Sequence, residues 1–462
     1  MTIEQLSLLD VNLNNSDNYR DKLIALLSED LDFHGQNNGY KSHNFHSFPA
    51  KFPPQLPRKF INGLTLENDV VLDPMVGSGT TILEALLAHR QGIGFDIDPL
   101  ALKIASVKVN TLDVNLVIKT GNEILEKARA AYRQNRDELL RILDCRWDIK
   151  TKEFIDYWFA KETQIELLAL IREIENILRP ELREFFELVF SAVIITKSGG
   201  VSLALDLAHT RPHKARFIVS KSGEIIIDEQ KDGRPAFITK ILRSAFDEFD
   251  KRFRNNLDGL IISSPKTASA RALFGNAESL PLSDDSVDLI ITSPPYASNA
   301  IDYMRAHKFS LVWMGFPIDD LGAKRKLYIG AEATTSIEFE KMPSFTQSVL
   351  NELTQTDRKK SVVVYRYYSE MTRVLKEMYR VLKPGKAAVV VVGNSVIRGI
   401  DMETQNCLAD IGRNMGFVVP KIGIRNLDRN KRMLPAGSKV DKNSQIQQRM
   451  HQEFVIGFYK PE

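Results

Sequence analysis

A glycine-rich turn between two short apolar runs is the feature that most constrains how this chain folds. Residues 69–73 form an apolar run, 74–81 hold the turn, 82–89 show helical spacing and 92–96 form a second apolar run. Pro99 then opens another helix, because proline is tolerated in a first helical turn. Strand, turn, helix and strand make a βαβ unit, which requires parallel strands joined by a right-handed crossover.

Length and composition place this unit in an ordinary globular protein. The 462 residues favour two domains, and 43% are hydrophobic and 26% charged. The net charge of +3 excludes a histone-like or tail-driven nucleic-acid binder. Two cysteines, Cys145 and Cys407, cannot build a disulfide framework or a structural zinc site. With no secretory signal and no apolar run of about 18 residues, we expect a cytoplasmic protein that binds no membrane and no metal.

A second α/β stretch begins near residue 266. Helical spacing covers 367–382, and Lys383-Pro384-Gly385 ends it. Residues 272–275 are the expected end of one strand, and the further expected strands are 287–292, 387–392 and, as a late edge strand, 454–459. Together the two stretches predict an α/β fold with a doubly wound, mostly parallel sheet.

The segment between the two stretches has a different pattern. Residues 123–143, 164–178 and 181–195 carry apolar side chains at helical spacing, and Pro180 separates the last two. We therefore expect a mainly helical insertion.

The glycine-rich turn and Asp96 predict a nucleoside site. Gly77 and Gly79 let the backbone approach a ligand closely, and the helix that follows offers free N–H groups. No lysine follows the second glycine, which excludes a phosphate-binding P-loop. Asp96, at the end of the next strand, can accept both hydroxyls of a ribose. A tight turn that binds nothing is the alternative for the two glycines alone, and Asp98 is the better candidate for the cap of the following helix.

Ser293-Pro294-Pro295-Tyr296 is the sharper signal. It follows a strand directly and therefore lies at the carboxyl edge of the sheet, where ligands bind in such folds. The Ser293 hydroxyl and the Pro294 carbonyl can each accept one hydrogen of an amino group, and Tyr296 can stack on a ring. These residues predict a site for a planar base that bears an amino group, with a structural Pro-Pro spacer as the alternative.

The two motifs together resemble the S-adenosylmethionine-dependent DNA amino-methyltransferases, which methylate cytosine N4 or adenine N6. The resemblance implies a Rossmann-like methyltransferase fold and covers about 42–112 and 272 to the C-terminus. Further segments are similar to the family's N-terminal cofactor motif, its adenine-cradling segment, the helix after its catalytic loop and the turn before its fifth strand; these are 46–54, 275–280, 301–315 and 382–385.

The resemblance also implies roles for individual residues. Catalytic roles fall on Ser293, Pro294, Pro295 and Tyr296. S-adenosylmethionine is the implied cofactor, and the residues implied to bind it are Phe48, Lys51, Phe52, Asp73, Pro74, Gly77, Ser78, Gly79, Thr80, Thr81, Asp96, Ile97, Asn276, Ala277, Glu278 and Ser293.

The order of the motifs resembles the family class whose recognition domain lies between the two halves of the enzyme. On that basis the insertion is a candidate target-recognition domain. The expected division is an N-terminal extension at 1–41, the cofactor-binding half at 42–112, the insertion at 113–265 and the catalytic half at 266–462.

Ser293 indicates the base that is methylated. Family members with serine at this position mostly act on cytosine, so cytosine N4 is expected and adenine N6 is the alternative. Neither cysteine has the Pro-Cys setting that a carbon-5 cytosine methylase needs. The expected partner is duplex DNA, with a cognate restriction endonuclease as a further partner. An RNA or protein methyltransferase and a catalytically silent DNA-binding subunit are rival interpretations.

A basic segment near the C-terminus is the expected DNA grip. Residues 421–450 hold eight basic and two acidic residues, so they carry +6 while the whole chain carries +3. Glycine and proline within the segment favour a loop. The candidate DNA contacts are Arg429, Lys431 and Arg432, with Arg211 and Lys214 of the insertion as the second candidates. A solvated basic loop without a partner is the alternative.

Overall fold

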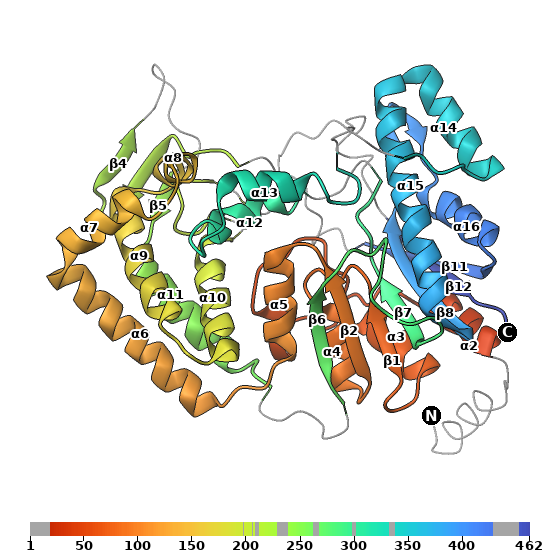
Figure 1. The fold of residues 1–462 in the computed structure, drawn as a ribbon, viewed down its shortest axis with the longest axis horizontal. Coiled ribbons are helices and arrows are strands. Elements are labelled where there is room, and N and C mark those ends of the chain that lie inside the picture. Colours follow the sequence, from red (N-terminus) through yellow and green to blue (C-terminus); the bar gives the residue numbers. More distant parts are fainter. Residues whose placement is uncertain are drawn as a thin grey trace.

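The computed structural model describes most of the chain as a central sheet flanked by helices, with a second lobe beside it (Figure 1). The described residues are 19–196, 198–205, 207, 212–228, 239–261, 268–297, 302–331, 338–427 and 452–462. Within these ranges, no helix is both long enough and apolar enough to cross a bilayer.

The central sheet has seven strands in the order β11-β12-β8-β7-β1-β2-β6. Four neighbouring pairs are parallel, and the pairs β8–β12 and β12–β11 are antiparallel. The strands are β1 (Val70–Asp73), β2 (Gln91–Asp96), β6 (Ala270–Phe274), β7 (Val287–Thr292), β8 (Leu382–Gly393), β11 (Val418–Asn426) and β12 (Gln452–Tyr459). The predicted mostly parallel α/β sheet is confirmed.

One prediction about this sheet was wrong. The last strand of the chain, β12, is not at the edge but lies between β8 and β11. The reason is that β11 and β12 form an antiparallel pair, so β11 takes the outer position and satisfies the backbone groups that β12 would otherwise leave open. Two basic residues of the segment predicted as a loop, Lys421 and Arg425, belong to β11.

Helices cover both faces of the sheet because alternate strand residues point to opposite sides. Val71, Leu289 and Val389 pack among the residues of one core, while Leu72 and Ile290 pack into the other. The first face is covered by α2 (Tyr19–Ser28), α3 (Gln55–Leu64), α4 (Thr80–Leu87) and α5 (Pro99–Val109), and the second by α14 (Ser344–Thr356), α15 (Arg358–Val381) and α16 (Thr404–Asn414). This arrangement is the predicted doubly wound fold.

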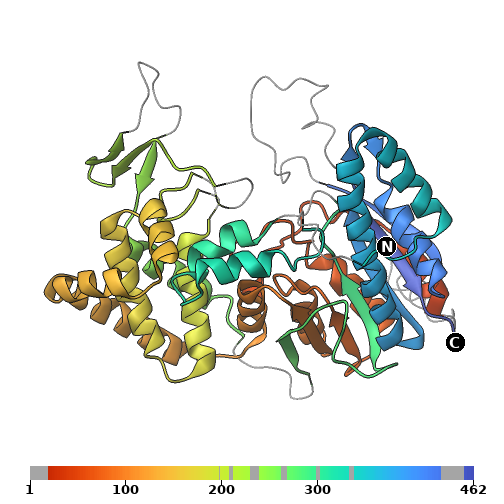
Figure 2. The ribbon, with the colours of Figure 1, turned by 45° about the horizontal axis from the view of Figure 1, so that its top comes forward.

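The second lobe is built from the segment between α5 and β6 (Figures 1 and 2). Its helices are α6 (Val114–Gln134), α7 (Arg136–Cys145), α8 (Ile149–Trp158), α9 (Lys161–Glu175), α10 (Pro180–Ile194) and α11 (Ala245–Leu257). Asn135 interrupts the helix predicted over 123–143, so α6 and α7 are separate. The lobe also contains a small sheet that was not predicted, formed by β3 (Phe217–Ser220), β4 (Ile225–Asp228) and β5 (Lys240–Leu242).

Two helices after β7 join this lobe to the sheet. They are α12 (Met304–Leu311) and α13 (Ile318–Arg325), and they share a hydrophobic core with the helices of the second lobe. The Trp147 indole donates to the Val312 carbonyl at 2.9 Å across this junction. The remaining short elements are the 3-10 helix η1 (Lys41–Asn44) and the hairpin of β9 (Val396–Ile397) and β10 (Ile400–Asp401).

Candidate active site

The glycine-rich turn leaves β1 at Asp73 and enters α4 at Thr80. Gly77 and Gly79 have φ values of +46° and +78°, in the left-handed region that favours glycine. A Cβ on Gly79 would also lie 2.8 Å from the Ala105 Cα, so the turn packs directly against α5. Gly79 is the N-cap of α4, and no side chain caps this helix. Backbone N–H groups of the first turn are therefore available to a ligand.

Asp96 lies at the end of β2, beside this turn. Its Oδ2 accepts from the Gly77 N–H and its Oδ1 accepts from the Asp98 N–H, both at 2.9 Å. Each carboxylate oxygen keeps a further lone pair for a ligand hydroxyl. Burial, with a smaller contribution from Asp98, raises the pKa of Asp96 to about 7. Asp98 itself accepts from the Leu100 and Ala101 N–H groups, which confirms that it caps α5.

A buried lysine supports the turn from α5. The side chain of Lys108 is fully buried, and its Nζ donates to the Ser78 carbonyl at 2.6 Å. Burial lowers the pKa of Lys108 well below its ordinary value. Sequence reasoning missed this residue, because a lysine in a helix is most often on the surface.

An aromatic and polar cluster connects α12 and the segments on either side of it to the end of β2. Phe48 stacks on Tyr303 with ring centroids 4.6 Å apart, and it lies next to Gly77. His307 Nδ1 lies 2.7 Å from Asp98 Oδ2, and the Tyr328 hydroxyl donates to the same oxygen at 2.6 Å. Residues 303–328 are thus held against the end of the strand that carries Asp96.

The segment after β6 forms a second wall of the candidate site, beside the end of β2. Asn276 is exposed, and its Oδ1 accepts from the Glu278 N–H at 3.0 Å. Glu278 is paired with Arg373 of α15 at 2.7 Å, so its carboxylate is already engaged within the protein. Ala277 is buried between them. Of the two polar candidates, Asn276 is the one whose side chain faces solvent.

The remaining predicted cofactor residues lie at the same edge of the sheet or in the core beneath it. Lys51 Nζ donates to the His43 carbonyl at 2.7 Å, and burial lowers the pKa of Lys51 to about 8. Phe52 is part of the core with α2 and α3. Asp73 is buried, which raises its pKa to about 6. Ser78, Thr80 and Thr81 are buried in the turn, Pro74 follows β1, and half-buried Ile97 lies between Asp96 and Asp98.

Ser293-Pro294-Pro295-Tyr296 directly follows β7, as predicted. Because β7 is the parallel neighbour of β1, this loop and the glycine-rich turn leave the sheet at the same edge. The Thr81 hydroxyl donates to the Ile291 carbonyl at 3.2 Å and so ties the start of α4 to the end of β7. Pro294 is buried and the other three residues are half-buried.

These features fit S-adenosylmethionine. Two turn glycines allow a close backbone approach, Asp96 offers carboxylate oxygens for ribose hydroxyls, and exposed Asn276 follows the strand next to β2. Phe48 and Tyr303 add an aromatic wall beside Gly77. The residues that would hold the cofactor therefore come mainly from the ends of three adjacent strands, β1, β2 and β6.

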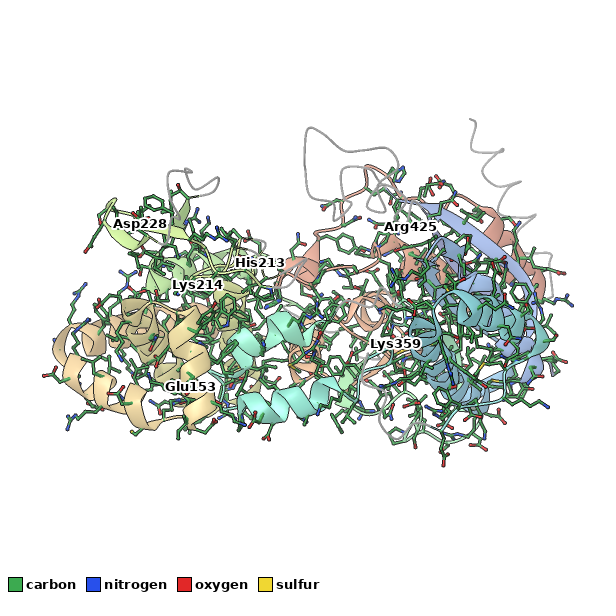
Figure 3. All side chains as sticks on the ribbon, turned by 90° about the horizontal axis from the view of Figure 1, so that it is seen from above. Glu153, His213, Lys214, Asp228, Lys359 and Arg425 are labelled. Atoms are coloured by element: carbon green, nitrogen blue, oxygen red, sulfur yellow. The ribbon has the colours of Figure 1, made fainter. Side chains whose placement is uncertain are left out.

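Of the five residues predicted to contact DNA, the described part of the chain includes one. Arg211, Arg429, Lys431 and Arg432 lie outside the described residues. Lys214 is described, and its Nζ lies 5.1 Å from the centroid of the Tyr157 ring. Seen from above, Lys214 and His213 lie in the second lobe, and Arg425 lies in the lobe of the central sheet (Figure 3).

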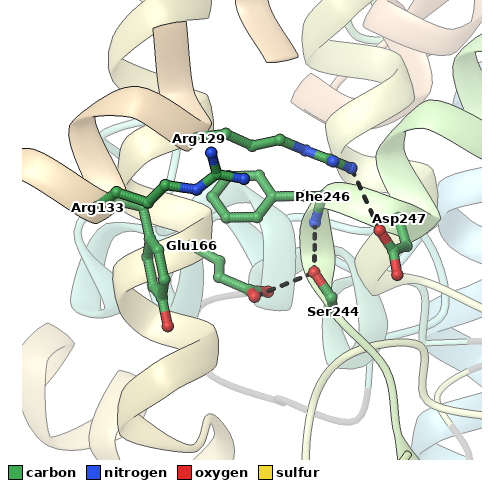
Figure 4. Close-up of a pocket in the computed structure, with 7 residues that line it drawn as sticks. Arg129, Arg133, Glu166, Ser244, Phe246 and Asp247 are labelled. Atoms are coloured by element: carbon green, nitrogen blue, oxygen red, sulfur yellow. Dashed lines mark hydrogen bonds and ion pairs between the residues drawn. The ribbon is translucent and has the colours of Figure 1, made fainter. Parts of the chain in front are cut away.

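A separate hollow of about 180 Å³ lies among the helices of the second lobe (Figure 4). Its lining residues bond mainly to one another: Arg129 pairs with Asp247 at 3.2 Å, and Ser244 donates to Glu166 at 3.0 Å. Ser244 and Glu166 accept N–H groups at the start of α11. This hollow is explained by helix capping, and we assign it no ligand.

Comparisons with known proteins agree with this site. A family model described as DNA methylase matches residues 14–107. Type II methyltransferase M.MvaI of Kocuria varians is 23% identical over 94% of this chain and 93% of its own length. Type II methyltransferase M.AvaI of Nostoc sp. is 25% identical over 76% of this chain and 74% of its own.

Among solved structures, a DNA modification methylase of Thermus thermophilus in complex with S-adenosyl-L-methionine is 19% identical over 41% of this chain and 54% of its own, with a TM-score of 0.21. The sequence comparisons match segments on both sides of the insertion, and the glycine-rich turn lies inside the family match. The family model and the Type II methyltransferases that this chain resembles support the DNA amino-methyltransferase family, with S-adenosylmethionine as the cofactor.

Proposed function

We propose that this DNA methyltransferase acts on the exocyclic N4 amine of a cytosine flipped out of duplex DNA. The observation that carries the proposal is the position of Ser293-Pro294-Pro295-Tyr296 at the end of β7, beside the strand that carries the glycine-rich turn. When bound, S-adenosylmethionine supplies an electrophilic methyl group on its sulfonium. The loop then has to present an amine to it.

The chemistry of the loop follows from its acceptors. The lone pair of an amine on a base is conjugated into the ring, so the amine is a poor nucleophile. The Ser293 hydroxyl and the Pro294 carbonyl accept the two amine hydrogens, favour a tetrahedral nitrogen and stabilise the positive charge that develops on it. Holding the amine in line with the methyl group accounts for a large part of the rate.

Base flipping makes the amine accessible. Unstacking a base costs a few kcal/mol, and stacking on the half-buried Tyr296 ring recovers part of that cost. No covalent intermediate is required. The two cysteines do not offer one at this edge, because Cys145 ends α7 in the second lobe and Cys407 is buried in α16.

The DNA partner is expected on the side of the sheet where the loop emerges. We propose that the second lobe is the target-recognition domain and that Arg429, Lys431 and Arg432 contact phosphates, with Arg211 and Lys214 as contacts from the lobe. The names of the relatives, Type II methyltransferases, support a role beside a cognate restriction endonuclease.

The test is to identify the methylated nucleoside. DNA prepared free of methylation is incubated with the full chain and S-adenosylmethionine, digested to nucleosides and analysed by mass spectrometry. We expect N4-methylcytosine. N6-methyladenine in its place would contradict the choice of base and leave the family assignment intact.

A further inference from the structure

The phenol of Tyr296 is bonded to a residue far away in the sequence. Its hydroxyl donates to Glu453 Oε1 at 2.9 Å. Glu453 is the second residue of β12, 157 positions later in the chain. It reaches the loop because β12 runs antiparallel to β8, so the start of β12 lies at the edge where the parallel strands end.

A second contact fixes the carboxylate itself. Arg425 lies directly opposite Glu453 in the β11–β12 pair, and its Nη1 donates to the other carboxylate oxygen, Oε2. The side chains of both residues are only 11% exposed. A carboxylate this buried requires charged or hydrogen-bonding partners on its oxygens, and here the two oxygens have different ones.

The consequence concerns the orientation of the Tyr296 ring. The ring packs against the core that contains α14 and α15, and the bond to Glu453 adds a directional restraint at the hydroxyl. An anchored hydroxyl limits the ring to a narrow range of side-chain rotation. A platform that is already oriented loses less conformational entropy when it captures a base than one that must be ordered on binding.

We propose that Glu453 is a positioning residue that, held by Arg425, fixes the Tyr296 ring in the orientation that stacks on the target base. The inference rests on the proposed role of Tyr296 in the site. It assigns to β11 and β12 a task in catalysis besides closing the sheet.

The alternative is that Glu453 only fastens the sheet to the loop. A matched pair at the opposite edge serves as the reference for such a role. Asp288, near the start of β7, has 7% of its side chain exposed, accepts from the Val70 N–H at 3.0 Å and pairs with Lys383 at 2.8 Å. Asp288→Asn therefore removes a buried carboxylate and its partly exposed ion pair from the same sheet without touching Tyr296.

The experiment is a double-mutant cycle in the full chain. Glu453→Gln, Tyr296→Phe and the double variant are compared with the unmodified protein and with Asp288→Asn. Single-turnover transfer of a radiolabelled methyl group to methylation-free phage DNA is measured, together with the thermal midpoint and the affinity for S-adenosylmethionine. The hydrogen bond has a charged acceptor, so we expect Glu453→Gln to lower the single-turnover rate about ten- to a hundredfold.

The decisive comparison is the double variant. Because Glu453 is proposed to act through the Tyr296 hydroxyl, Glu453→Gln should have no further effect once that hydroxyl is removed, and cofactor affinity should stay unchanged throughout. Asp288→Asn should change the thermal midpoint but not the rate. Rate losses that multiply in the double variant, or a Glu453→Gln that loses no rate, would overturn the proposal.

Digesting the labelled DNA to nucleosides separates the test of Glu453 from the question of which base is methylated. N6-methyladenine in the labelled DNA would contradict the cytosine proposal, while the coupling between Glu453 and Tyr296 would still be measured on the observed product.

Discussion

Binding of S-adenosylmethionine should depend on pH through one carboxylate, Asp96. Its pKa of about 7 lies well above the ordinary value for aspartate, because the half-buried carboxylate is desolvated and Asp98 is close to it. The ribose hydroxyls would donate to the ionised form, and the protonated form offers fewer acceptors. The affinity for S-adenosylmethionine should therefore be highest at pH values above the pKa of Asp96 and fall as the pH drops through that pKa.

The expected size follows from the fraction of ionised Asp96. With a pKa of about 7, roughly nine tenths of the carboxylate is ionised at about pH 8 and roughly one tenth at about pH 6, so Kd should rise about tenfold between them. Asp96→Asn should weaken binding about ten- to a hundredfold at the higher pH, since at least one charge-assisted hydrogen bond is lost.

Isothermal titration calorimetry across this range measures both effects. Asp96→Asn is also the control for other titrations, because it leaves Asp73 and Lys51 in place, whose pKa values are about 6 and about 8. In the Asp96→Asn variant, the change in Kd near pH 7 should be absent. A Kd that is constant over the range, or a variant with an unchanged pH profile, would refute the assignment of the ribose to Asp96.

Three further predictions concern the turn, the loop and the DNA grip. Ser293→Ala and Tyr296→Ala should each reduce methyl transfer by about a hundredfold or more while calorimetry finds cofactor affinity nearly intact; equal losses of both would give the loop a structural role. Gly79→Ala should lower the free energy of unfolding by about 1–3 kcal/mol, because Gly79 has φ of +78° and an added Cβ would lie 2.8 Å from the Ala105 Cα. An unchanged denaturation midpoint would contradict this. Replacing Arg429, Lys431 and Arg432 with alanine should weaken binding to all DNA sequences alike. It should also reduce the slope of log affinity against log salt concentration by about two to three units. The control Lys376→Ala, an exposed position near the C-terminal end of α15, should leave that slope unchanged.

The fold was predictable where local pattern and chain connectivity agree. The turn between 73 and 80, the helix starts at Asp98 and Pro180 and the buried strand at 387–392 all carry short-range signals. The small sheet of β3, β4 and β5 was not predicted because its strands are three or four residues long, too short for an alternating pattern to stand out. The position of β12 inside the sheet depends on pairing with β11, which no local pattern encodes.

The residues of the site likewise include some that the sequence indicates and some that only the fold reveals. The glycines, Asp96 and the Ser-Pro-Pro-Tyr loop each lie at a strand end and were selected from the sequence. Lys108 and Glu453 were not, because their partners Ser78 and Tyr296 are 30 and 157 residues away. Contacts of this kind follow from the three-dimensional fold, and only a polar group in a buried position identifies them.

A crystal structure of the chain with S-adenosylmethionine bound would show whether the ends of β1, β2 and β6 hold the cofactor beside the 293–296 loop. We expect the ribose hydroxyls to lie within hydrogen-bonding distance of Asp96, the adenine to lie beside Ala277, and the methyl group to point toward Ser293 and Pro294. A cofactor bound elsewhere, or one whose methyl group points away from this loop, would contradict this expectation.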